Sequence, residues 1–305
     1  MSVHSRRANA ILVDPARGLP TRHHGAMTTP AYGRAWSASL ARVPDATLRA
    51  WLAFALELCD AADEIALAHF RRDLDVERKP DRTFVTEADR GIERLLRERI
   101  HARHPDHGLV GEEYGTEDGD ARTRWYIDPI DGTHNFIRGV PLFGTLLGIE
   151  HDGELQVGVI SAPAMRERWY AYRGGGAWNR SLDGVRPIRV SRVAAIEDAQ
   201  VLYGSSRDTI ASGLMPGFAA LISAAWRERG FGDFWGYALV AEGAGEAMFE
   251  TGCKAWDMAG PIVVIEEAGG LVTDVDGERT VDGASFVGTN GLLHEEILRR
   301  LRQAP

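Results

Sequence analysis

The sequence has few cysteines, no long apolar run and no excess of positive charge, and each shortage excludes a class of protein. Cys59 and Cys253 are the only cysteines among 305 residues. This count argues against a disulfide framework or a cysteine-based zinc site, and it fits a reducing cytoplasm. No run of roughly 18 apolar residues occurs, so no membrane span is expected. The net charge of −9 argues against general nucleic-acid binding.

Composition and charge leave a globular enzyme as the broad class. Hydrophobic residues make up 44% of the chain, which is normal for a soluble protein, and 305 residues can bury a large core in one compact unit or two tightly joined halves. The sequence pI is about 5.6, yet an acidic protein can bind a phosphate when a bound metal reverses the local field. The glycines at 174–176 lack the Gly-Lys-Ser/Thr ending of a Walker P-loop and favour a hairpin turn.

The first 44 residues differ in composition from the rest of the chain. They are rich in Arg, Ala, Gly, Pro and Ser, contain Asp14 as their only acid, and show no long apolar periodicity. This composition predicts a disordered N-terminal extension at 1–44, or an overcalled start with Met27 as an internal start. An Arg-rich, acid-poor targeting peptide is the more specific alternative. The folded domain is expected at 45–305.

Hydrophobic periodicity predicts helices and strands that alternate along most of the chain. Apolar residues at helical spacing indicate helices at 45–70, 87–101, 217–229, 235–245, 257–268 and 292–301. Alternating or β-branched runs indicate strands at 76–86 (with a loop), 146–150, 156–161, 168–172, 201–206, 230–233, 247–250, 271–274 and 286–289. This alternation predicts an α/β protein with layers of helices and sheets.

The stretch from Trp125 to Phe136 is the strongest candidate for chemistry. Its first three residues are aromatic or β-branched and uncharged, which predicts the end of a buried strand. Pro129 fixes its own backbone and restricts Asp128, so we expect a stiff turn that holds Asp128 and Asp131 close together. Two such carboxylates repel each other unless a cation such as Mg²⁺ lies between them. For this short motif alone, an ordinary acidic turn stays the alternative.

His101, His104 and His107 form a second, weaker candidate for metal binding, because they are three residues apart. On one helix they would make a metal-binding face. Pro105 breaks that helix, however, and histidines near a helix C-terminus also suit the helix dipole. We therefore favour a structural role for these histidines.

Several ordered motifs around the central stretch resemble the signature of the inositol monophosphatase family of Mg²⁺-dependent phosphomonoesterases. The resemblance covers about residues 48–302 and rests on the central stretch together with Lys79-Pro80-Asp81, Val85-Thr86-Glu87-Ala88-Asp89, Gly111-Glu112-Glu113, Trp256-Asp257-Met258-Ala259-Gly260 and Glu266-Glu267-Ala268-Gly269-Gly270. Together these motifs are far more specific than any one of them. The resemblance implies the family's layered α-β-α-β-α sandwich, of the sugar phosphatase type, and a homodimer.

The resemblance also implies the metal ligands. The carboxylates of Glu112, Asp128, Asp131 and Asp257 match the family's ligands, and the main-chain carbonyl of Ile130 is a further one. Four carboxylates and a phosphate dianion bring about six negative charges together. We expect two or three Mg²⁺ ions per active site to balance them, with Mn²⁺ as a substitute. One ion would activate a water and another would stabilise the leaving alkoxide.

Other matching positions imply how water and phosphate are held. Thr133 and Asp89 match a family pair that orients the attacking water, and Glu112 assists through its metal. The backbone amides of Gly132 and Thr133 are expected to hold phosphate oxygens, with Lys79 near them. Helix capping for Thr133 and Asp89, and solvent exposure for Lys79, stay open as plainer alternatives.

The segment expected on the substrate side departs from the inositol enzymes. Residues 229–237 have the sequence Arg-Gly-Phe-Gly-Asp-Phe-Trp-Gly-Tyr and look like the histidinol-phosphatase branch of the family. L-Histidinol phosphate carries an ammonium and an imidazole, so Asp233 is expected to pair with a cation, and Phe231 or Trp235 to pack against a flat ring. Glu250 stands where the family places a substrate-contacting Glu. Core packing stays the alternative for the two aromatic residues.

These residues predict a cytoplasmic, Mg²⁺-dependent phosphomonoesterase for a small-molecule substrate, with neither nucleic acid nor a membrane as a partner. The expected activity is that of a histidinol-phosphatase of histidine biosynthesis. Inositol-1-monophosphatase and a broad-specificity sugar or nucleotide phosphatase are the alternatives within the family. A non-catalytic regulatory relative is the alternative from another class, and the intact carboxylates of the metal site argue against it.

Overall fold

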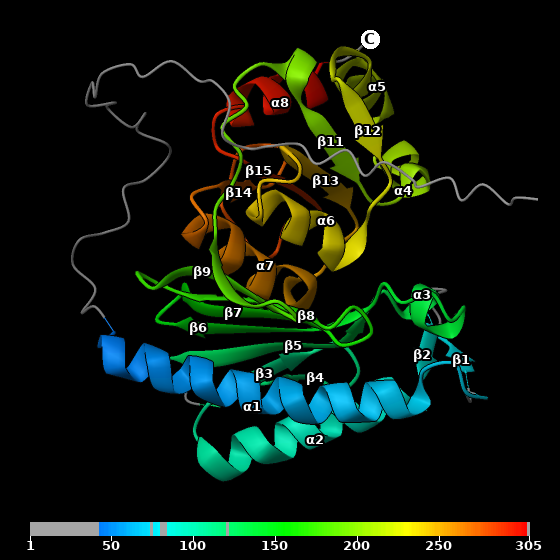
Figure 1. The fold of residues 1–305 in the computed structure, drawn as a ribbon. Helices are drawn as coiled ribbons and strands as arrows, with labels where there is room; N and C mark the ends of the chain where they lie inside the picture. The colour runs from blue at the N-terminus through cyan, green and yellow to red at the C-terminus, as the bar shows by residue number, and fades with distance from the viewer. Residues whose placement is uncertain (1–42, 74–75, 80–83, 120–121, 304–305) are drawn as a thin grey trace, which may run out of the picture. The chain divides into compact units, whose positions relative to one another are not determined.

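Two large β-sheets organise the part of the chain that the computed structural model describes, residues 43–73, 76–79, 84–119 and 122–303 (Figure 1). The expected N-terminal extension lies outside the described residues except for its last two, and so do Pro80 and Asp81 of the first family motif. Expectations for those segments stay predictions. Within the described ranges, no helix is both long and apolar enough to cross a membrane.

The larger sheet has eight strands. They are β3 (Gly108–Gly111), β4 (Gly115–Glu117), β5 (Thr123–Asp131), β6 (Gly144–His151), β7 (Glu154–Ala162), β8 (Glu167–Tyr172), β9 (Gly176–Ser181) and β10 (Gly184–Ile188). Their order is β10-β9-β8-β7-β6-β5-β3-β4, and β3 and β5 are parallel whereas the other neighbours are antiparallel. A separate antiparallel pair joins β1 (Val76–Arg78) to β2 (Phe84–Thr86).

The smaller sheet has five strands. They are β11 (Gln200–Tyr203), β12 (Arg227–Arg229), β13 (Ala247–Thr251), β14 (Leu271–Thr273) and β15 (Ser285–Thr289). Their order is β12-β11-β13-β15-β14. The pairs that include β11 are parallel, and the pairs that include β15 are antiparallel.

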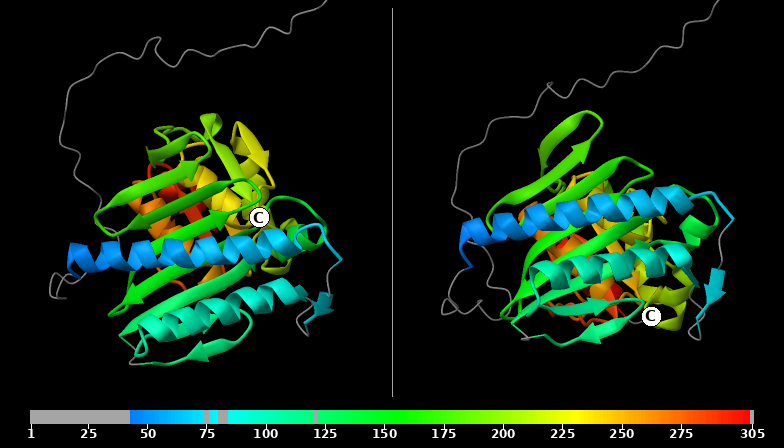
Figure 2. Two further views of the ribbon diagram at one scale, coloured as in Figure 1. Left: turned by 60° about the horizontal axis from the view of Figure 1, so that its bottom comes forward. Right: turned by 90° about the horizontal axis from the view of Figure 1, so that it is seen from below.

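Helices cover both sheets and fill the space between them. They are α1 (Asp45–His69), α2 (Glu87–Arg103), α3 (Thr133–Ile137), α4 (Ser206–Ala211), α5 (Met215–Ala224), α6 (Asp233–Ala241), α7 (Ala255–Glu267) and α8 (His294–Leu301), with a 3₁₀ turn η1 (Ile196–Asp198). α1 and α2 lie side by side on one face of the larger sheet (Figure 2). α6 and α7 lie between the sheets, and α5 and α8 cover the far face of the smaller sheet (Figure 1). This order of layers confirms the expected α-β-α-β-α sandwich.

The larger sheet is apolar on both faces because helices cover both. Trp125 and Ile127 of β5 pack with α1 and α2, whereas Tyr126 between them packs in the core beneath α7. This alternation follows from the two-residue period of a strand. Gly158 of β7 lets α7 approach closely, because a Cβ there would lie 2.2 Å from the carbonyl oxygen of Gly260. The close approach matters for function, because α7 carries Asp257.

The secondary structure predicted from the sequence was wrong between residues 206 and 233. The helix expected at 217–229 ends at Ala224, and residues 227–229 form β12 instead. The strand expected at 230–233 is a loop that leads into α6. Gly230 and Gly232 weaken a strand, since glycine has no side chain to pack. The short helix α4 was missed; its cap is the Ser205 hydroxyl, which accepts the amide of Asp208 at 3.1 Å.

Candidate active site

The central stretch is a strand with a bulge and not the stiff turn expected from its proline. β5 continues to Asp131, and its register against β6 shifts between Asp128 and Asp131. Side chains three residues apart on a regular strand point to opposite faces, but the extra residue of a bulge resets the alternation. Ile130 accordingly packs with α1 and α2, although Tyr126, four residues earlier, faces α7. The bulge thereby turns both carboxylates to the same side.

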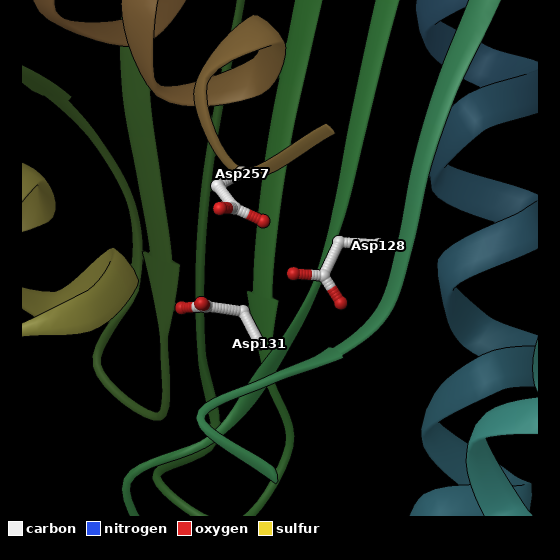
Figure 3. A group of neighbouring side chains, drawn as sticks. All are labelled: Asp128, Asp131 and Asp257. Carbon is white, nitrogen blue, oxygen red and sulfur yellow. The ribbon is translucent and has the colours of Figure 1, made fainter. Parts of the chain in front are cut away.

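Asp128, Asp131 and Asp257 meet in one cluster. Each offers a carboxylate oxygen, and these oxygens all lie within 4.8 Å of one another, as Figure 3 shows. Asp257 lies in the first turn of α7, where its carboxylate accepts the amide of Lys254 at 2.7 Å. The amide of Phe234 donates to the Asp131 carboxylate at 2.6 Å. Elements far apart in the sequence therefore hold the three carboxylates together.

The carboxylates of the cluster favour their protonated forms when no cation lies between them. Desolvation, followed by the charges of Glu112 and Asp131, raises the pKa of Asp128 well above its ordinary value. Desolvation and the charge of Asp233 likewise raise the pKa of Asp131. Desolvation raises the pKa of Asp257 to about 7 against the opposing hydrogen bond from Lys254. A cation placed among these groups would reverse these shifts.

The cluster fits a hard divalent cation. Asp128 Oδ1 is buried and has no hydrogen-bond partner among the described residues. A buried acceptor without a donor is unfavourable, and a divalent cation that prefers carboxylate oxygens would satisfy it. Within the described ranges, the three aspartates are also the only group of three or more side chains with the spacing of metal ligands.

The three histidines have structural partners instead. His104 and His107 stack with their ring centroids 4.4 Å apart. The indole nitrogen of Trp125 donates to His107 at 2.9 Å. His101 lies 3.1 Å from Glu117. These contacts support the structural role that we favoured.

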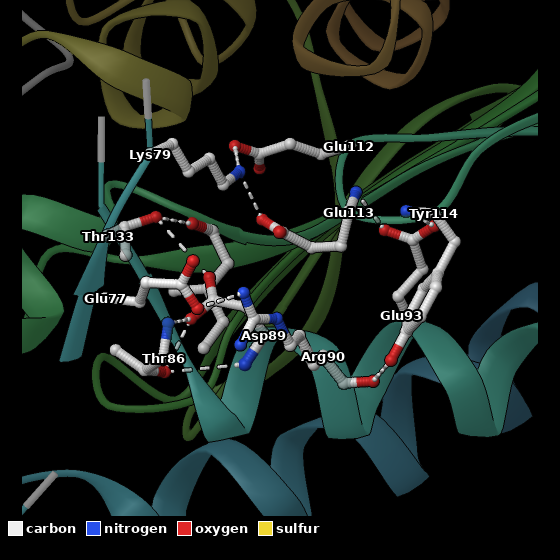
Figure 4. A network of polar contacts seen from close by, with 11 residues as sticks. Glu77, Lys79, Thr86, Asp89, Arg90, Glu93, Glu112, Glu113, Tyr114 and Thr133 are labelled. Carbon is white, nitrogen blue, oxygen red and sulfur yellow. Dashed lines mark hydrogen bonds and ion pairs between the residues drawn. The ribbon is translucent and has the colours of Figure 1, made fainter. Parts of the chain in front are cut away.

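Glu112 follows β3, and after desolvation its charge helps to raise the pKa of Asp128, although Glu112 is not among the three carboxylates that meet in the cluster. Its neighbour Glu113 and the next residue, Tyr114, donate their amides to Glu93 of α2 at 2.7 and 3.1 Å. The Lys79 ammonium donates to Glu112 Oε1 at 2.9 Å and to Glu113 Oε1 at 2.6 Å (Figure 4). Lys79 is therefore half-buried between two carboxylates and is not the exposed side chain of the plainer alternative.

Asp89 and Thr133 also lie close to each other. Asp89 is buried in the first turn of α2, where its Oδ2 accepts the amide and the hydroxyl of Thr86 at 2.8 and 2.5 Å. The Thr133 hydroxyl lies 3.5 Å from Asp89 Oδ1 and donates to the Ile130 carbonyl at 2.9 Å (Figure 4). Desolvation raises the pKa of Asp89 to about 6, although the hydrogen bonds from Thr86 oppose the shift. Asp89 thus caps its helix and also faces Thr133.

Gly132 joins the bulged strand to α3. Its φ is 79°, and a Cβ at this position would lie 2.8 Å from the carbonyl oxygen of Leu142. Glycine adopts positive φ without strain, so both the backbone and the space require glycine here. The residue places the Thr133 amide at the first position of α3, next to the carboxylate cluster.

An acidic pocket of about 130 Å³ adjoins the cluster. It is lined by Asp131, Asp233, Phe234, Tyr237, Glu250, Thr251, Gly252, Cys253 and Asp257. Asp233 has a positive φ of 55°, and its Oδ2 accepts the side-chain amide of Asn135 at 3.2 Å. Desolvation, followed by the charges of Asp233 and Asp257, raises the pKa of Glu250 to about 8. The structure therefore brings the expected residues Asp233 and Glu250 to the metal cluster.

Phe231 and Trp235 do not line this pocket. Their rings lie 4.7 Å apart with an interplanar angle of 37°, and both are half-buried against the core between the sheets. The structure gives them the packing partners of the plainer alternative. A contact with a substrate ring stays a prediction.

Sequence reasoning missed four groups at the site. They are the amide of Phe234, the side chain of Asn135, and the residues Tyr237 and Thr251, which line the pocket. Tyr237 had a usable signal, because it follows Asp233 by one helical turn and residues four apart share a helix face. Asn135 lies inside the central stretch, but its partner is 98 residues away, and no local pattern indicates that contact.

Comparisons with known proteins agree with this geometry. The profile of the inositol monophosphatase family matches residues 47–305. The chain is 44% identical over 253 residues to the histidinol-phosphatase of Mycobacterium tuberculosis, which covers 82% of this chain and 97% of the relative. It is 40% identical to the histidinol-phosphatase of Streptomyces coelicolor, over 81% of this chain and 94% of that one.

A solved structure shares the fold as well. The IMPase of Thermotoga maritima has a TM-score of 0.75 at 32% sequence identity, and the match covers 83% of this chain and 96% of that one. The sequence profile, the relatives and the fold all point to one family. The chain belongs to the inositol monophosphatase family.

Proposed function

We propose that this protein is a histidinol-phosphatase, a divalent-metal-dependent phosphomonoesterase that hydrolyses L-histidinol phosphate to L-histidinol and phosphate. One observation carries the proposal: the cluster of Asp128, Asp131 and Asp257 opens into a pocket with two further carboxylates, Asp233 and Glu250. The cluster suits a metal-assisted hydrolysis, and the further carboxylates suit a cationic substrate. The names of the mycobacterial and streptomycete relatives support the same substrate.

The carboxylates of Glu112, Asp128, Asp131 and Asp257 would hold the metal, with the Ile130 carbonyl as a further ligand. Two or three Mg²⁺ ions would balance the charge, and Mn²⁺ would be a substitute. When bound, these ions supply positive charge that polarises the phosphoryl group and lowers the pKa of a water. The unpartnered Oδ1 of Asp128 supports this assignment.

Asp89 and Thr133 orient the attacking water in this proposal. Asp89 Oδ2 is occupied by Thr86, whereas Oδ1 faces the Thr133 hydroxyl. If the Ile130 carbonyl binds a metal, the Thr133 hydroxyl can turn its proton from that carbonyl to Asp89 Oδ1 and receive a hydrogen bond from the water. The water oxygen forms a bond to phosphorus as the phosphorus–oxygen ester bond breaks. Of the two protons of the water, one ends on the leaving alcohol and the other stays with the phosphate or with Asp89.

The phosphate is held by the backbone amides of Gly132 and Thr133, with Lys79 near them. Lys79 is bonded to Glu112 and Glu113, so its ammonium is fixed at the edge of the metal site. A cation held there favours the bound phosphate dianion.

Asp233 pairs with the ammonium of histidinol, Glu250 contacts the same part of the substrate, and Phe231 or Trp235 packs against the imidazole. Inositol-1-monophosphatase, the activity in the family's name, is the second candidate. Inositol carries no cation, so an acidic pocket offers it hydrogen bonds without charge pairing. The position of Asp233 on the pocket wall favours histidinol phosphate.

The proposal also covers the location, the oligomeric state and the domain bounds of the enzyme. We infer a cytoplasmic homodimer whose phosphatase domain comprises residues 45–305, with residues 1–44 as a disordered extension. Family resemblance supports the dimer, and the acid-poor composition of the first residues supports the extension.

A phosphate-release assay with purified protein tests the proposed function. With Mg²⁺ present, histidinol phosphate should release phosphate; Mn²⁺ should substitute, and Ca²⁺ should inhibit because it prefers a larger and looser ligand shell. Full activity after exhaustive chelation would contradict the role of the carboxylate cluster. The absence of phosphate release from histidinol phosphate with both Mg²⁺ and Mn²⁺ would contradict the assignment as a histidinol-phosphatase.

A further inference from the structure

Residues 112–114 form the loop between β3 and β4, and Glu112 is the first of them. All three backbone amides of this loop have acceptors. The Glu112 amide donates to a carbonyl of β5 at 3.2 Å. The amides of Glu113 and Tyr114 donate to the two carboxylate oxygens of Glu93 at 2.7 and 3.1 Å (Figure 4). One carboxylate of α2 thus fixes the rest of the loop that carries an expected metal ligand.

Gly111, the last residue of β3, leaves the space that Glu93 occupies. A Cβ at position 111 would collide with Glu93 Oε1. The Glu93 side chain is fully buried, and a buried carboxylate is costly unless donors surround it. The loop amides and a neighbouring guanidinium are those donors. The chain therefore provides both the space and the donors for a carboxylate against this loop.

Arg97 supplies the guanidinium and extends the contact to β4. Its Nε donates to Glu93 Oε1 at 2.8 Å, and its Nη1 donates to Glu117 Oε1 at 2.8 Å. Its Nη2 donates to the carbonyl of Gly115, where β4 begins. A planar guanidinium with its donors in a fixed fork suits such a set of acceptors. Glu93 and Arg97 thus hold the loop and the strand that follows it.

Asp89, Glu93 and Arg97 are four residues apart on α2, so their side chains share one helix face. All three are buried. Asp89 faces Thr133, and Glu93 holds the loop of Glu112. Apolar residues in place of a buried ion pair are often as stabilising or more so. Stability alone therefore does not account for charged residues on this face of the helix.

Glu112 must be free to turn towards the cluster while its backbone stays in place. After desolvation, the charge of Glu112 is the largest cause that raises the pKa of Asp128, so the two carboxylates are electrostatic neighbours. Glu112 Oε1 accepts the Lys79 ammonium at 2.9 Å and has to leave it to reach a cation beside Asp128. With the loop backbone fixed, only side-chain rotations are lost on binding, and loss of backbone freedom would cost more.

We propose that Glu93 and Arg97 are positioning residues that clamp the loop between β3 and β4 and hold Glu112 where a divalent cation beside Asp128 requires it. This inference rests on the proposed function and deepens it, because it names the residues that position one of the expected metal ligands. The clamp acts on the backbone of the loop. Its loss should weaken metal binding through Glu112 and leave the three aspartates of the cluster in place.

Glu93→Gln tests the clamp on the purified, metal-free protein. Gln keeps the size of the side chain, but it has one acceptor oxygen in place of two and no charge. Titration calorimetry with Mn²⁺ should show about tenfold weaker binding than in the wild type. Activity on p-nitrophenyl phosphate should need a correspondingly higher Mg²⁺ concentration, whereas kcat at saturating Mg²⁺ should stay within about threefold of the wild type.

Gly111→Ala keeps the clamp testable if the loss of a buried charge prevents folding. Gly111 does not have a positive φ, so alanine causes no backbone strain there. The new methyl group displaces Glu93 from the loop, and both charges of the ion pair with Arg97 remain. This variant should also bind Mn²⁺ about tenfold more weakly.

Glu246→Gln is the matched control for an effect of stability. Glu246 is also buried, and its carboxylate also accepts a backbone amide, that of Gln200 at 2.6 Å at the start of β11. Loss of the charge should lower Tm, because a hydrogen bond to a buried charged acceptor weakens. The affinity for Mn²⁺ should stay within about twofold of the wild type, because Glu246 orients no expected metal ligand.

Unchanged Mn²⁺ affinity in both Glu93→Gln and Gly111→Ala would overturn the clamp. An equal loss of affinity in Glu246→Gln would also overturn it, because weaker binding would then follow from lower stability. A fall in kcat at saturating Mg²⁺ with unchanged metal affinity would do the same. If the wild type binds Mn²⁺ but releases no phosphate from histidinol phosphate, the proposed function fails, and the titrations still decide on the clamp. If the wild type binds no Mn²⁺, the clamp fails together with the metal site.

Discussion

The backbone amide of Phe234 donates a 2.6 Å hydrogen bond to the carboxylate of Asp131. This bond ties the start of α6 to the bulged end of β5. Beside it, the Asn135 side chain donates to Asp233 at 3.2 Å. The helix that carries the candidate specificity residue is thereby fixed against the strand that carries two candidate metal ligands. The metal cluster and the substrate pocket are therefore adjacent. Asp233 is not one of the expected metal ligands, so a substitution there and a substitution in the cluster should have separable effects on activity.

The metal ligands give the first prediction. Asp128→Asn and Asp257→Asn each keep the side-chain shape and remove one charge from the metal cluster. We expect kcat to fall by roughly a hundredfold or more, because metal activation supplies several kcal/mol of the rate enhancement. In the absence of metal, Tm should stay the same or rise, since mutual repulsion among the carboxylates decreases.

The control for these variants is Asp152→Asn, which removes the same charge from an exposed ion pair with Arg122. It should leave kcat unchanged. Steady-state kinetics at saturating Mg²⁺ with thermal melts of the metal-free proteins make the comparison. Near-normal turnover in either cluster variant would show that the ligand assignment is wrong.

Substrate selectivity gives the second prediction. Asp233→Asn removes the charge that we pair with the ammonium, and Asn tolerates the positive φ of 55° at this position. Loss of one charge-assisted contact should cost about 1.5–3 kcal/mol, or roughly ten- to hundredfold in kcat/KM for histidinol phosphate. Hydrolysis of p-nitrophenyl phosphate, which has no ammonium, should change little. Equal losses on both substrates would count against Asp233 as a specificity residue.

The predictions above depend on a site that the sequence indicates only in part. The metal ligands were expected from a motif resemblance, and the structure brings the carboxylates of Asp128, Asp131 and Asp257 together. Their role as metal ligands stays a prediction. The bulge in β5 could not be predicted, because Pro129 favours a turn and only pairing with β6 shows otherwise. The contact of Asn135 with Asp233 was also out of reach, since the two residues are 98 positions apart in the sequence.

The fold was more predictable than the site. Long amphipathic segments such as α1 and α2 have many periodic positions, so their pattern is strong, and the structure places both within a few residues of the expectation. The short β12 has three residues, and its pairing with β11 decides its conformation. Local sequence carries little information about such an element. The strand expected at 230–233 is a loop, because Gly230 and Gly232 have no side chains to pack in a sheet.

A buried histidine gives the third prediction, which concerns stability. The ring nitrogens of His294 lie 2.9 and 3.0 Å from the hydroxyls of Thr289 and Thr273. Desolvation lowers its pKa from 6.5 to about 4. The unfolded chain therefore takes up this proton near pH 6.5 and the folded chain only near pH 4, so stability is lost as the pH falls through that window.

The expected loss from His294 between pH 7.5 and pH 5 is about 2 kcal/mol. Urea unfolding of the wild type and of His294→Gln at both pH values measures it. The stability difference between the two proteins should shrink by that amount at pH 5, because other titrating groups contribute equally to both. A difference that is the same at both pH values would refute the neutral, buried state of this histidine.

The N-terminal residues give the fourth prediction. Residues 1–44 have too little apolar periodicity to form a core. Deletion of these residues should leave both Tm and kcat/KM nearly unchanged. Thermal melts and phosphate-release assays on the shortened and full-length proteins make the comparison. A clear drop in Tm would mean that these residues pack on the phosphatase domain.

The most direct test of the proposed function is the ratio of kcat/KM for histidinol phosphate to kcat/KM for inositol 1-phosphate, measured on the wild type at saturating Mg²⁺. Both substrates present the same phosphate to the carboxylate cluster, and only one brings a cation to Asp233 and Glu250. One charge-assisted contact is worth about 1.5–3 kcal/mol, so we expect a ratio of at least roughly ten in favour of histidinol phosphate. A ratio near one, or a preference for inositol 1-phosphate, would contradict the assignment as a histidinol-phosphatase.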